Sequence, residues 1–267
     1  MIYYDLSYKT YNMKKNILLS FCIAFLSFKA IATPTKLTVR VKAKDAKFIG
    51  TPIGGAYVLV KNHQTCALLS NGLTSGSSGD TKLLLQTTHN RYQSLTDEKT
   101  AKYVAELDIK EPTLVDIEVN APVSRKGSAI KASTQVWLIP GKDILGDGII
   151  LELPGLILDI LAPTTHQIIP LESLKEKTLL FKISLTMLCG CPISKDGVWD
   201  AADFEVGAVL KKEGIEVGKY TLSKAQETNI FEGKLPILEK GNYELQVYAF
   251  QAKGNNSGVD IINFVIQ

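Results

Sequence analysis

Apolar and polar residues alternate with a period of two along three stretches of this chain. The alternation is clearest at residues 37–43, 179–187 and 243–249. Because successive side chains of a β-strand point to opposite faces, each stretch can bury one face and leave the other in water. The pattern predicts half-buried strands, with one face in the core and the other in water.

The first half of the chain gives further strands by the same reasoning, at residues 83–88, 103–109, 113–119 and 134–139. Trp137 stands inside the last of these strands, and we expect it in the core. Residues 70–82 are rich in Ser, Gly and Thr, which predicts an exposed loop. Thr96-Asp97-Glu98 is a good helix start, so one short helix is expected within residues 94–102.

Residues 149–162 form the most apolar stretch after the amino end, and Pro154 and Gly155 interrupt it. Such interruptions exclude a membrane helix and favour two strands with a boundary at residues 153–156. Seven strands are then expected in the second half of the chain. They lie at residues 158–170 with a kink at Pro163, and at 179–187, 204–211, 215–222, 228–235, 243–250 and 259–266. The predicted fold is mostly β with little helix: an N-terminal β domain at 33–153 and an Ig-like sandwich at 154–267.

The amino end has the pattern of a signal peptide. Lys14 and Lys15 precede an apolar run at residues 17–28, and Ala30-Ile31-Ala32 forms a small-x-small cleavage site. We therefore expect residues 1–32 to be removed, and we expect Met13 rather than Met1 to be the initiating residue. Cleavage removes four lysines and one aspartate from 30 basic and 27 acidic side chains, which leaves 26 of each. A neutral mature chain gives no electrostatic reason to bind nucleic acid, and no membrane span is expected after cleavage.

Three cysteines remain after cleavage, namely Cys66, Cys189 and Cys191. Exported cysteines tend to pair, so Cys189 can bridge Cys191, or one of the two can bridge Cys66. Two thiolates at this spacing can also bind a soft ion such as Cu(I) or Zn, although no second pair completes the ligand shell. A third interpretation is a redox dithiol, because a bridge across so short a loop is strained.

An acidic cluster follows the cysteine pair and contains Asp196, Asp200 and Asp203. Carboxylates at this density can hold calcium, but the sequence lacks the usual calcium-loop spacing, and capping of a turn is the simpler interpretation. The three histidines are far apart in the sequence. No hydrolase or dinucleotide motif is present, so no cofactor is expected and catalysis has no positive support, although an enzyme of unrecognised type stays open.

Four aromatic residues lie near predicted turns, namely Tyr92, Trp199, Tyr220 and Phe231. A ring that stands free at a turn can stack on a glycan or enter a protein interface. A ring that closes the end of a sandwich belongs to the core instead. Both interpretations stay open for each of the four.

Short motifs resemble known families. Gly241-x-Tyr243-x-Leu245-x-Val247 resembles the tyrosine corner of Ig-like domains, in which a tyrosine hydroxyl bonds back to the preceding loop. The spacing of Pro52, Gly55, Ala56, Val58 and Val60 resembles the opening of prealbumin-like and carboxypeptidase-regulatory-like sandwiches. The run at residues 188–192 and the segment 254–260 are similar to uncharacterised exported proteins of intracellular Gram-negative bacteria. That resemblance implies a type II secretion substrate with a two-sheet, chair-like fold, which is released through the periplasm.

These observations predict a secreted, non-catalytic binding or adhesion protein whose partner is an extracellular protein or glycan. The loops at residues 71–81 and 251–258 are the expected contact regions. The alternative is an extracytoplasmic redox or metal-handling protein that uses Cys189 and Cys191.

Overall fold

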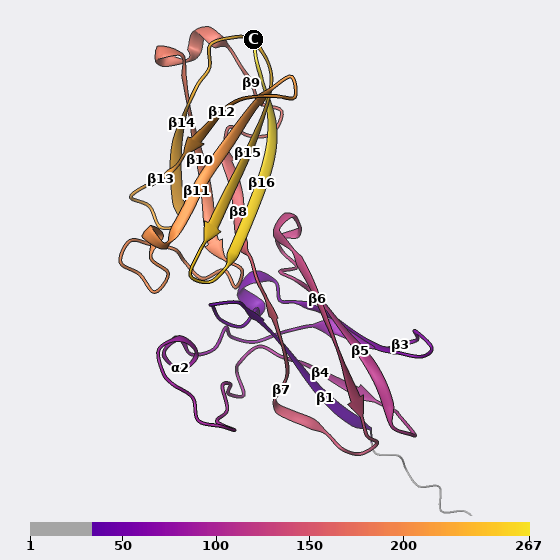
Figure 1. Ribbon diagram of the computed structural model, residues 1–267. Coiled ribbons are helices and arrows are strands. Elements are labelled where there is room, and N and C mark those ends of the chain that lie inside the picture. Colours follow the sequence, from indigo (N-terminus) through magenta and orange to yellow (C-terminus); the bar gives the residue numbers. More distant parts are fainter. Residues whose placement is uncertain (1–33) are drawn as a thin grey trace, which may run out of the picture. The chain divides into compact units, whose positions relative to one another are not determined.

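The computed structural model describes residues 34–267, which form one compact unit. The predicted signal peptide at 1–32, its expected start at Met13 and the fourth cysteine, Cys22, lie outside the described residues. Within them the chain is mostly β, as predicted, with sixteen strands and a single five-residue α-helix (Figure 1). No helix in this part of the chain is long and apolar enough to cross a membrane.

The first seven strands form two sheets that pack face to face, the N-terminal sandwich. One sheet has the order β4-β1-β7 and the other the order β3-β2-β5-β6. The strands are β1 (Thr35–Ala43), β2 (Tyr57–Asn62), β3 (Leu68–Leu73), β4 (Tyr103–Leu107), β5 (Thr113–Ala121), β6 (Ile130–Leu138) and β7 (Ile144–Leu153). Alternate residues of β5 are buried, as its sequence pattern predicts. In β1 the expected water-facing side is also buried, because Thr38 and Arg40 are covered as well as Leu37, Val39 and Val41.

The segment between β3 and β4 corrects three expectations. Residues 83–88 do not form a strand, because Asp80 accepts a hydrogen bond from the Leu83 backbone N–H at 2.6 Å and caps a short helix, α2 (Thr81–Leu85). The expected helix at 94–102 is absent, since the Asp97 side chain holds the Thr100 N–H and hydroxyl in a turn. Residues 70–82 are only partly exposed, and Thr74 is buried.

This segment covers the side of the β4-β1-β7 sheet that is turned away from the sandwich core. Arg40 lies on that side and is fully buried. Its guanidinium donates to the backbone carbonyls of Thr100, Ala101 and Gly146 at 2.5–3.0 Å. Asp147 accepts hydrogen bonds from three consecutive residues, 94–96. Burial opposes ionisation of Asp147, but these hydrogen bonds outweigh it, and the pKa of the carboxyl lies below its ordinary value. Two buried or half-buried charged groups thus fix the covering segment to the sheet.

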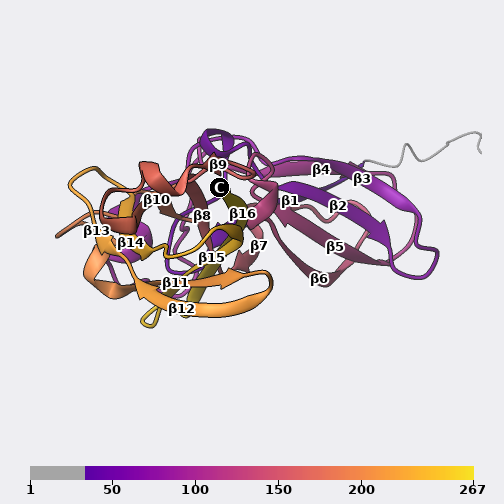
Figure 2. The same ribbon diagram turned by 90° about the horizontal axis from the view of Figure 1, so that it is seen from above.

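The remaining strands form the C-terminal sandwich, with sheet orders β13-β14-β10-β8 and β12-β11-β15-β16-β9. Its strands are β8 (Leu156–Ala162), β9 (Ile168–Ile169), β10 (Thr178–Met187), β11 (Phe204–Lys212), β12 (Ile215–Thr221), β13 (Ser223–Lys224), β14 (Ile230–Pro236), β15 (Gly241–Gln251) and β16 (Asn256–Ile266). The two layers are seen from their ends in Figure 2. This is the Ig-like arrangement of an A-B-E-D sheet against a sheet that contains C, F and G.

Two local predictions in this sandwich are confirmed. The predicted kink at Pro163 separates β8 from β9, and the structure places these two strands in different sheets. Tyr243, at the start of β15, donates its hydroxyl hydrogen to the Glu239 carbonyl at 2.8 Å, which is the predicted tyrosine-corner bond. Its ring stacks on Phe264 with centroids 5.4 Å apart. Strand β7 ends at Leu153 and β8 begins at Leu156, so the apolar stretch at 149–162 contains two strands.

The expected contact loop at 251–258 is much shorter than predicted. Only residues 252–255 connect β15 to β16, and the flanking Gln251 and Asn256 are buried. Asn256 donates to the Lys44 carbonyl at 3.1 Å and accepts from the Gly155 N–H at 2.8 Å. The turn therefore packs against the segment that follows β1.

Candidate functional site

The sheet β3-β2-β5-β6 exposes large apolar side chains on the face turned away from the core, here called the outer face. Trp137 is 57% exposed, although we expected it in the core. Tyr57, Leu68 and Leu73 stand on the same face and are 38–53% exposed. Trp137 points outward because it shares its side of β6 with the exposed Lys131, Ser133 and Gln135. The strand's own alternation carries this signal, but the apolar nature of tryptophan suggested burial.

Polar side chains form a hydrogen-bonded group beside Trp137. Asp116 on β5 lies opposite Gln135 on β6, and the Gln135 Nε2 donates to the Asp116 Oδ1 at 2.7 Å. The Nδ1 of His63 lies 3.1 Å from both carboxylate oxygens. Hydrogen bonds from Gln135 and His63 hold the pKa of Asp116 below its ordinary value. An ionised carboxylate, an amide and an imidazole are therefore held next to an exposed indole ring.

A shallow hollow of about 370 Å³ lies further along the outer face. Its walls include Tyr57 and Leu59 from β2, Glu118 from β5, and Lys131 and Ser133 from β6. The Tyr57 hydroxyl donates to Asn71 at 3.1 Å, which orients the ring. The outer face thus combines aromatic and aliphatic side chains with polar groups that are held by hydrogen bonds.

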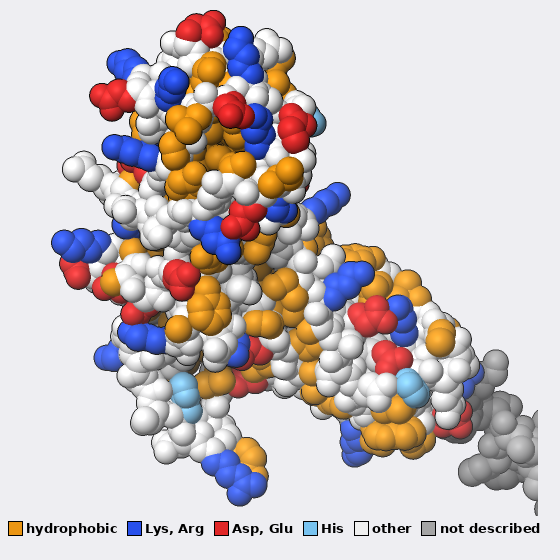
Figure 3. All heavy atoms as spheres, turned by 45° about the horizontal axis from the view of Figure 1, so that its top comes forward, with side chains coloured by type: hydrophobic (Ala, Val, Ile, Leu, Met, Phe, Trp, Pro, Cys, Tyr) orange, Lys and Arg blue, Asp and Glu red, His pale blue; other side chains and the backbone are white. Residues whose placement is uncertain are grey.

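Charges of both signs are mixed on the protein surface. Figure 3 shows Lys and Arg side chains interspersed with Asp and Glu over the visible face, without a large region of one sign. On the outer face the Lys61 ammonium pairs with Glu118 at 2.7 Å. A surface of this kind does not attract a ligand by its net field, so recognition depends on local contacts.

The four aromatic residues singled out from the sequence do not come together. Trp199 and Phe231 are 6% and 2% exposed, so their rings belong to the core and are unavailable for stacking. The Trp199 indole N–H donates to the Asp45 carbonyl at 2.8 Å. Tyr92 is 88% exposed on the covering segment, with the Arg91 guanidinium 4.6 Å from the ring centroid. Tyr220 is half-buried in β12.

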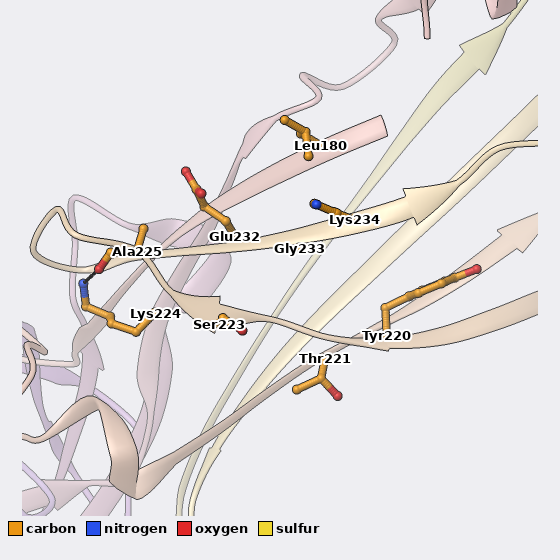
Figure 4. A pocket seen from close by; sticks show the side chains of 9 residues that line it. All are labelled: Leu180, Tyr220, Thr221, Ser223, Lys224, Ala225, Glu232, Gly233 and Lys234. Carbon is orange, nitrogen blue, oxygen red and sulfur yellow. Dashed lines mark hydrogen bonds between the residues drawn. The ribbon is translucent and has the colours of Figure 1, made fainter. Parts of the chain in front are cut away.

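Tyr220 lies at one end of a hollow of about 430 Å³ beside the short strand β13 (Figure 4). The Lys224 ammonium in this hollow is turned toward the chain, since it donates to the Ala225 carbonyl at 2.7 Å. Glu232 is paired with Lys182 at 2.5 Å. The charged groups of this hollow are largely occupied by protein partners, which makes it a poorer candidate than the outer face.

Two side chains of the acidic cluster have protein partners, and one of them caps a turn. Asp200 accepts from the Ala202 N–H at 3.0 Å and caps a short 3-10 turn, and Asp203 pairs with Lys253 at 2.6 Å. Asp196 adopts a left-handed backbone conformation in the preceding loop. Among residues 34–267, no group of three or more His, Cys, Asp or Glu side chains is arranged to hold a metal ion.

The three cysteines of residues 34–267 are free thiols in the structure. Cys66 is exposed in the turn between β2 and β3, whereas Cys189 and Cys191 are buried just after β10. Hydrogen bonding from Cys191 lowers the pKa of Cys189 to about 7, although burial opposes this shift. The same hydrogen bond, aided by burial, raises the pKa of Cys191.

Comparison with known proteins finds no matching family model and no matching curated protein. Solved structures do match, at low identity. The fibronectin(III)-like modules of Clostridium thermocellum CbhA are 11% identical over 90% of this chain and 92% of that chain, with a TM-score of 0.28. The chicken interferon gamma receptor alpha chain is 11% identical over 87% and 98%, with a TM-score of 0.30. The titin domains Z1Z2 are 9% identical over 88% and 96%, with a TM-score of 0.25. The Ig-like assignment rests on the strand order and the tyrosine corner described above.

Proposed function

We propose that this chain is an exported binding protein that holds an extracellular glycan on its outer face. The observation that carries the proposal is the exposed indole of Trp137 beside the Asp116, Gln135 and His63 group. A sugar ring has an apolar face of C–H groups and an edge of hydroxyls. An aromatic ring stacks on the first, and fixed carboxylate and amide groups bond to the second.

The distribution of apolar residues favours a glycan over a protein partner. The core of a protein interface is depleted of charged residues. On the outer face, rows of charged and polar side chains such as Lys61, Asp116 and Glu118 separate the apolar residues. A polyhydroxylated ligand presents the same alternation of polar and apolar surface within a few ångströms. No bond-making step is assigned to these side chains.

Export is the second part of the proposal. It is supported by the basic residues, the apolar run and the small-residue cleavage site that follow one another at the amino end. We propose passage through the periplasm and release by type II secretion. Mass spectrometry of the protein from culture medium should find Thr33 as the first residue. Retention of the full chain in the cytoplasm would contradict this part without affecting the binding site.

A glycan array probed with the mature protein tests the binding site. We expect wild-type protein to bind a set of glycans and Trp137→Ala to lose at least tenfold in affinity. Tyr92→Ala is the matched control, because Tyr92 is the more exposed ring and lies away from the outer face. Equal loss in both variants, unchanged binding by Trp137→Ala, or capture of protein partners alone would contradict the proposal.

A further inference from the structure

Strand β6 is the last strand of the β3-β2-β5-β6 sheet, and the side that it turns away from β5 is here called the free edge (Figure 2). Its nine residues pair with β5 without a register shift. The pairings of the edge strands β3, β7, β8 and β12 each contain such a shift. Within residues 34–267, the backbone of β6 has no hydrogen-bond partner outside its ladder with β5. A regular strand with unpaired backbone groups is a template for the addition of another strand.

The free edge lacks the features with which proteins usually block strand addition. Those features are proline, a charged side chain that points inward, a bulge, or a very short strand. Residues 130–138 contain no proline and one charged residue, Lys131, which lies near the start of the strand and is exposed. The apolar side chains on the core side, Ile130, Ala132 and Val136, are only partly buried. A strand added at the free edge would cover them further.

We propose that the free edge of β6 pairs with the free edge of a second copy of this chain, antiparallel and centred on Thr134. On the outer face, Lys131 then lies opposite Trp137 of the second copy, where an ammonium group can contact the indole ring. Ser133 lies opposite Gln135 of the second copy. The Gln135 Nε2 already donates to Asp116, so the Gln135 Oε1 is the atom that can accept from the Ser133 hydroxyl.

The sequence of β6 matches itself on both sides, which favours a second copy over an unrelated strand. On the core side, Ala132 lies opposite Val136 of the second copy, and Ile130 lies opposite Leu138. Apolar residues therefore meet apolar residues, and Thr134 meets its own copy on the two-fold axis, where Thr–Thr pairs are favourable. Only this register pairs all nine residues. The inference rests on the edge of the sheet and not on the proposed glycan site. One strand from each copy makes a small interface, so we expect a weak dimer that depends on concentration.

Sedimentation equilibrium of the purified mature protein tests this inference. We expect the mass to rise from one chain toward two as the protein concentration is raised. Ser133→Lys combined with Gln135→Lys places ammonium groups opposite each other twice across the two-fold axis. This variant should raise the dissociation constant at least tenfold. Ser133→Lys combined with Gln135→Glu places opposite charges at the same positions and should restore the dimer. Both positions are exposed, so the fold of one chain should tolerate either change.

The edge strand β12 supplies the matched control. Ile215 and Val217 are 72% and 49% exposed there, so Ile215→Lys combined with Val217→Lys adds the same two charges at a different edge. This variant should dimerise as the wild-type protein does. A wild-type protein that stays monomeric up to about 1 mM would overturn the proposal. Loss of the dimer in the β12 variant, or equal loss in the two variants of β6, would also overturn it, because association would then not use this edge in this register.

Discussion

Replacement of Asn256 by alanine should destabilise the protein, because its buried amide joins three segments of the chain. Asn256 is 0% exposed. Its oxygen accepts from the Gly155 N–H at 2.8 Å, and its nitrogen donates to the Lys44 carbonyl at 3.1 Å and to the Gln251 Oε1 at 2.8 Å. Asn256→Ala removes all three hydrogen bonds at once.

The magnitude follows from the groups that lose their partner. A buried polar group left unpaired costs about 1–3 kcal/mol. Three groups are affected, but water that enters the space left by the amide restores part of the loss. We therefore expect Asn256→Ala to lower the free energy of unfolding by about 3 kcal/mol, which is large for a single substitution.

Urea unfolding followed by tryptophan fluorescence measures this change. Trp199 is buried and hydrogen bonded to Asp45, next to the contacts that Asn256 makes. We expect a lower midpoint with an unchanged slope, since the unfolded surface stays the same. Ser257→Ala is the control, because Ser257 is the exposed neighbour on the same strand. A change within about 0.5 kcal/mol for Asn256→Ala would refute the reasoning, because that is the range of ordinary surface substitutions.

Two other predictions concern stability. Tyr243→Phe keeps the stacked ring but removes the hydrogen bond from the hydroxyl to the Glu239 carbonyl. It should therefore lower the free energy of unfolding, measured in urea, by about 1 kcal/mol. An unchanged free energy of unfolding would show that this hydrogen bond does not stabilise the protein. The pKa of Asp147 is lower in the folded protein than in the unfolded chain, where it is about 4. The ionised carboxylate therefore contributes fully to the stability of the fold above a pH of about 4, and this contribution is lost as the pH falls through the pKa of the folded state. Wild-type protein should therefore lose more stability between about pH 5 and pH 2 than Asp147→Asn does, and equal losses would exclude this role for Asp147.

The strands were predictable wherever one face is buried, because the period of two records burial directly. β10 shows this best, with Phe181, Ile183, Leu185 and Met187 all buried as their alternation predicts. The tyrosine corner was predictable for a different reason: it needs only a turn and a tyrosine close together in the sequence.

The errors arise where a local hydrogen bond or a distant contact outweighs the pattern. A single cap from Asp80 turns an apolar run into helix α2, which is too short to show a helical period. The sequence indicated that Asn256 and Gln251 are polar loop residues, but both are buried. Their hydrogen-bond partners are residues 44, 45 and 155, which are far away in the sequence, so the local pattern gave no sign of the burial. The candidate site was missed because Trp137 was assigned by residue type, although the side of β6 that it shares with Lys131 and Gln135 indicated exposure.

Fluorine NMR of the mature protein labelled with 5-fluorotryptophan tests the central claim most directly. The chain has two tryptophans, and the structure places Trp137 on the outer face and Trp199 in the core. During titration with a glycan selected from the array, the Trp137 resonance should shift and saturate while the Trp199 resonance stays in place. A glycan that binds, as judged by calorimetry, without moving the Trp137 resonance would show that the ligand lies elsewhere.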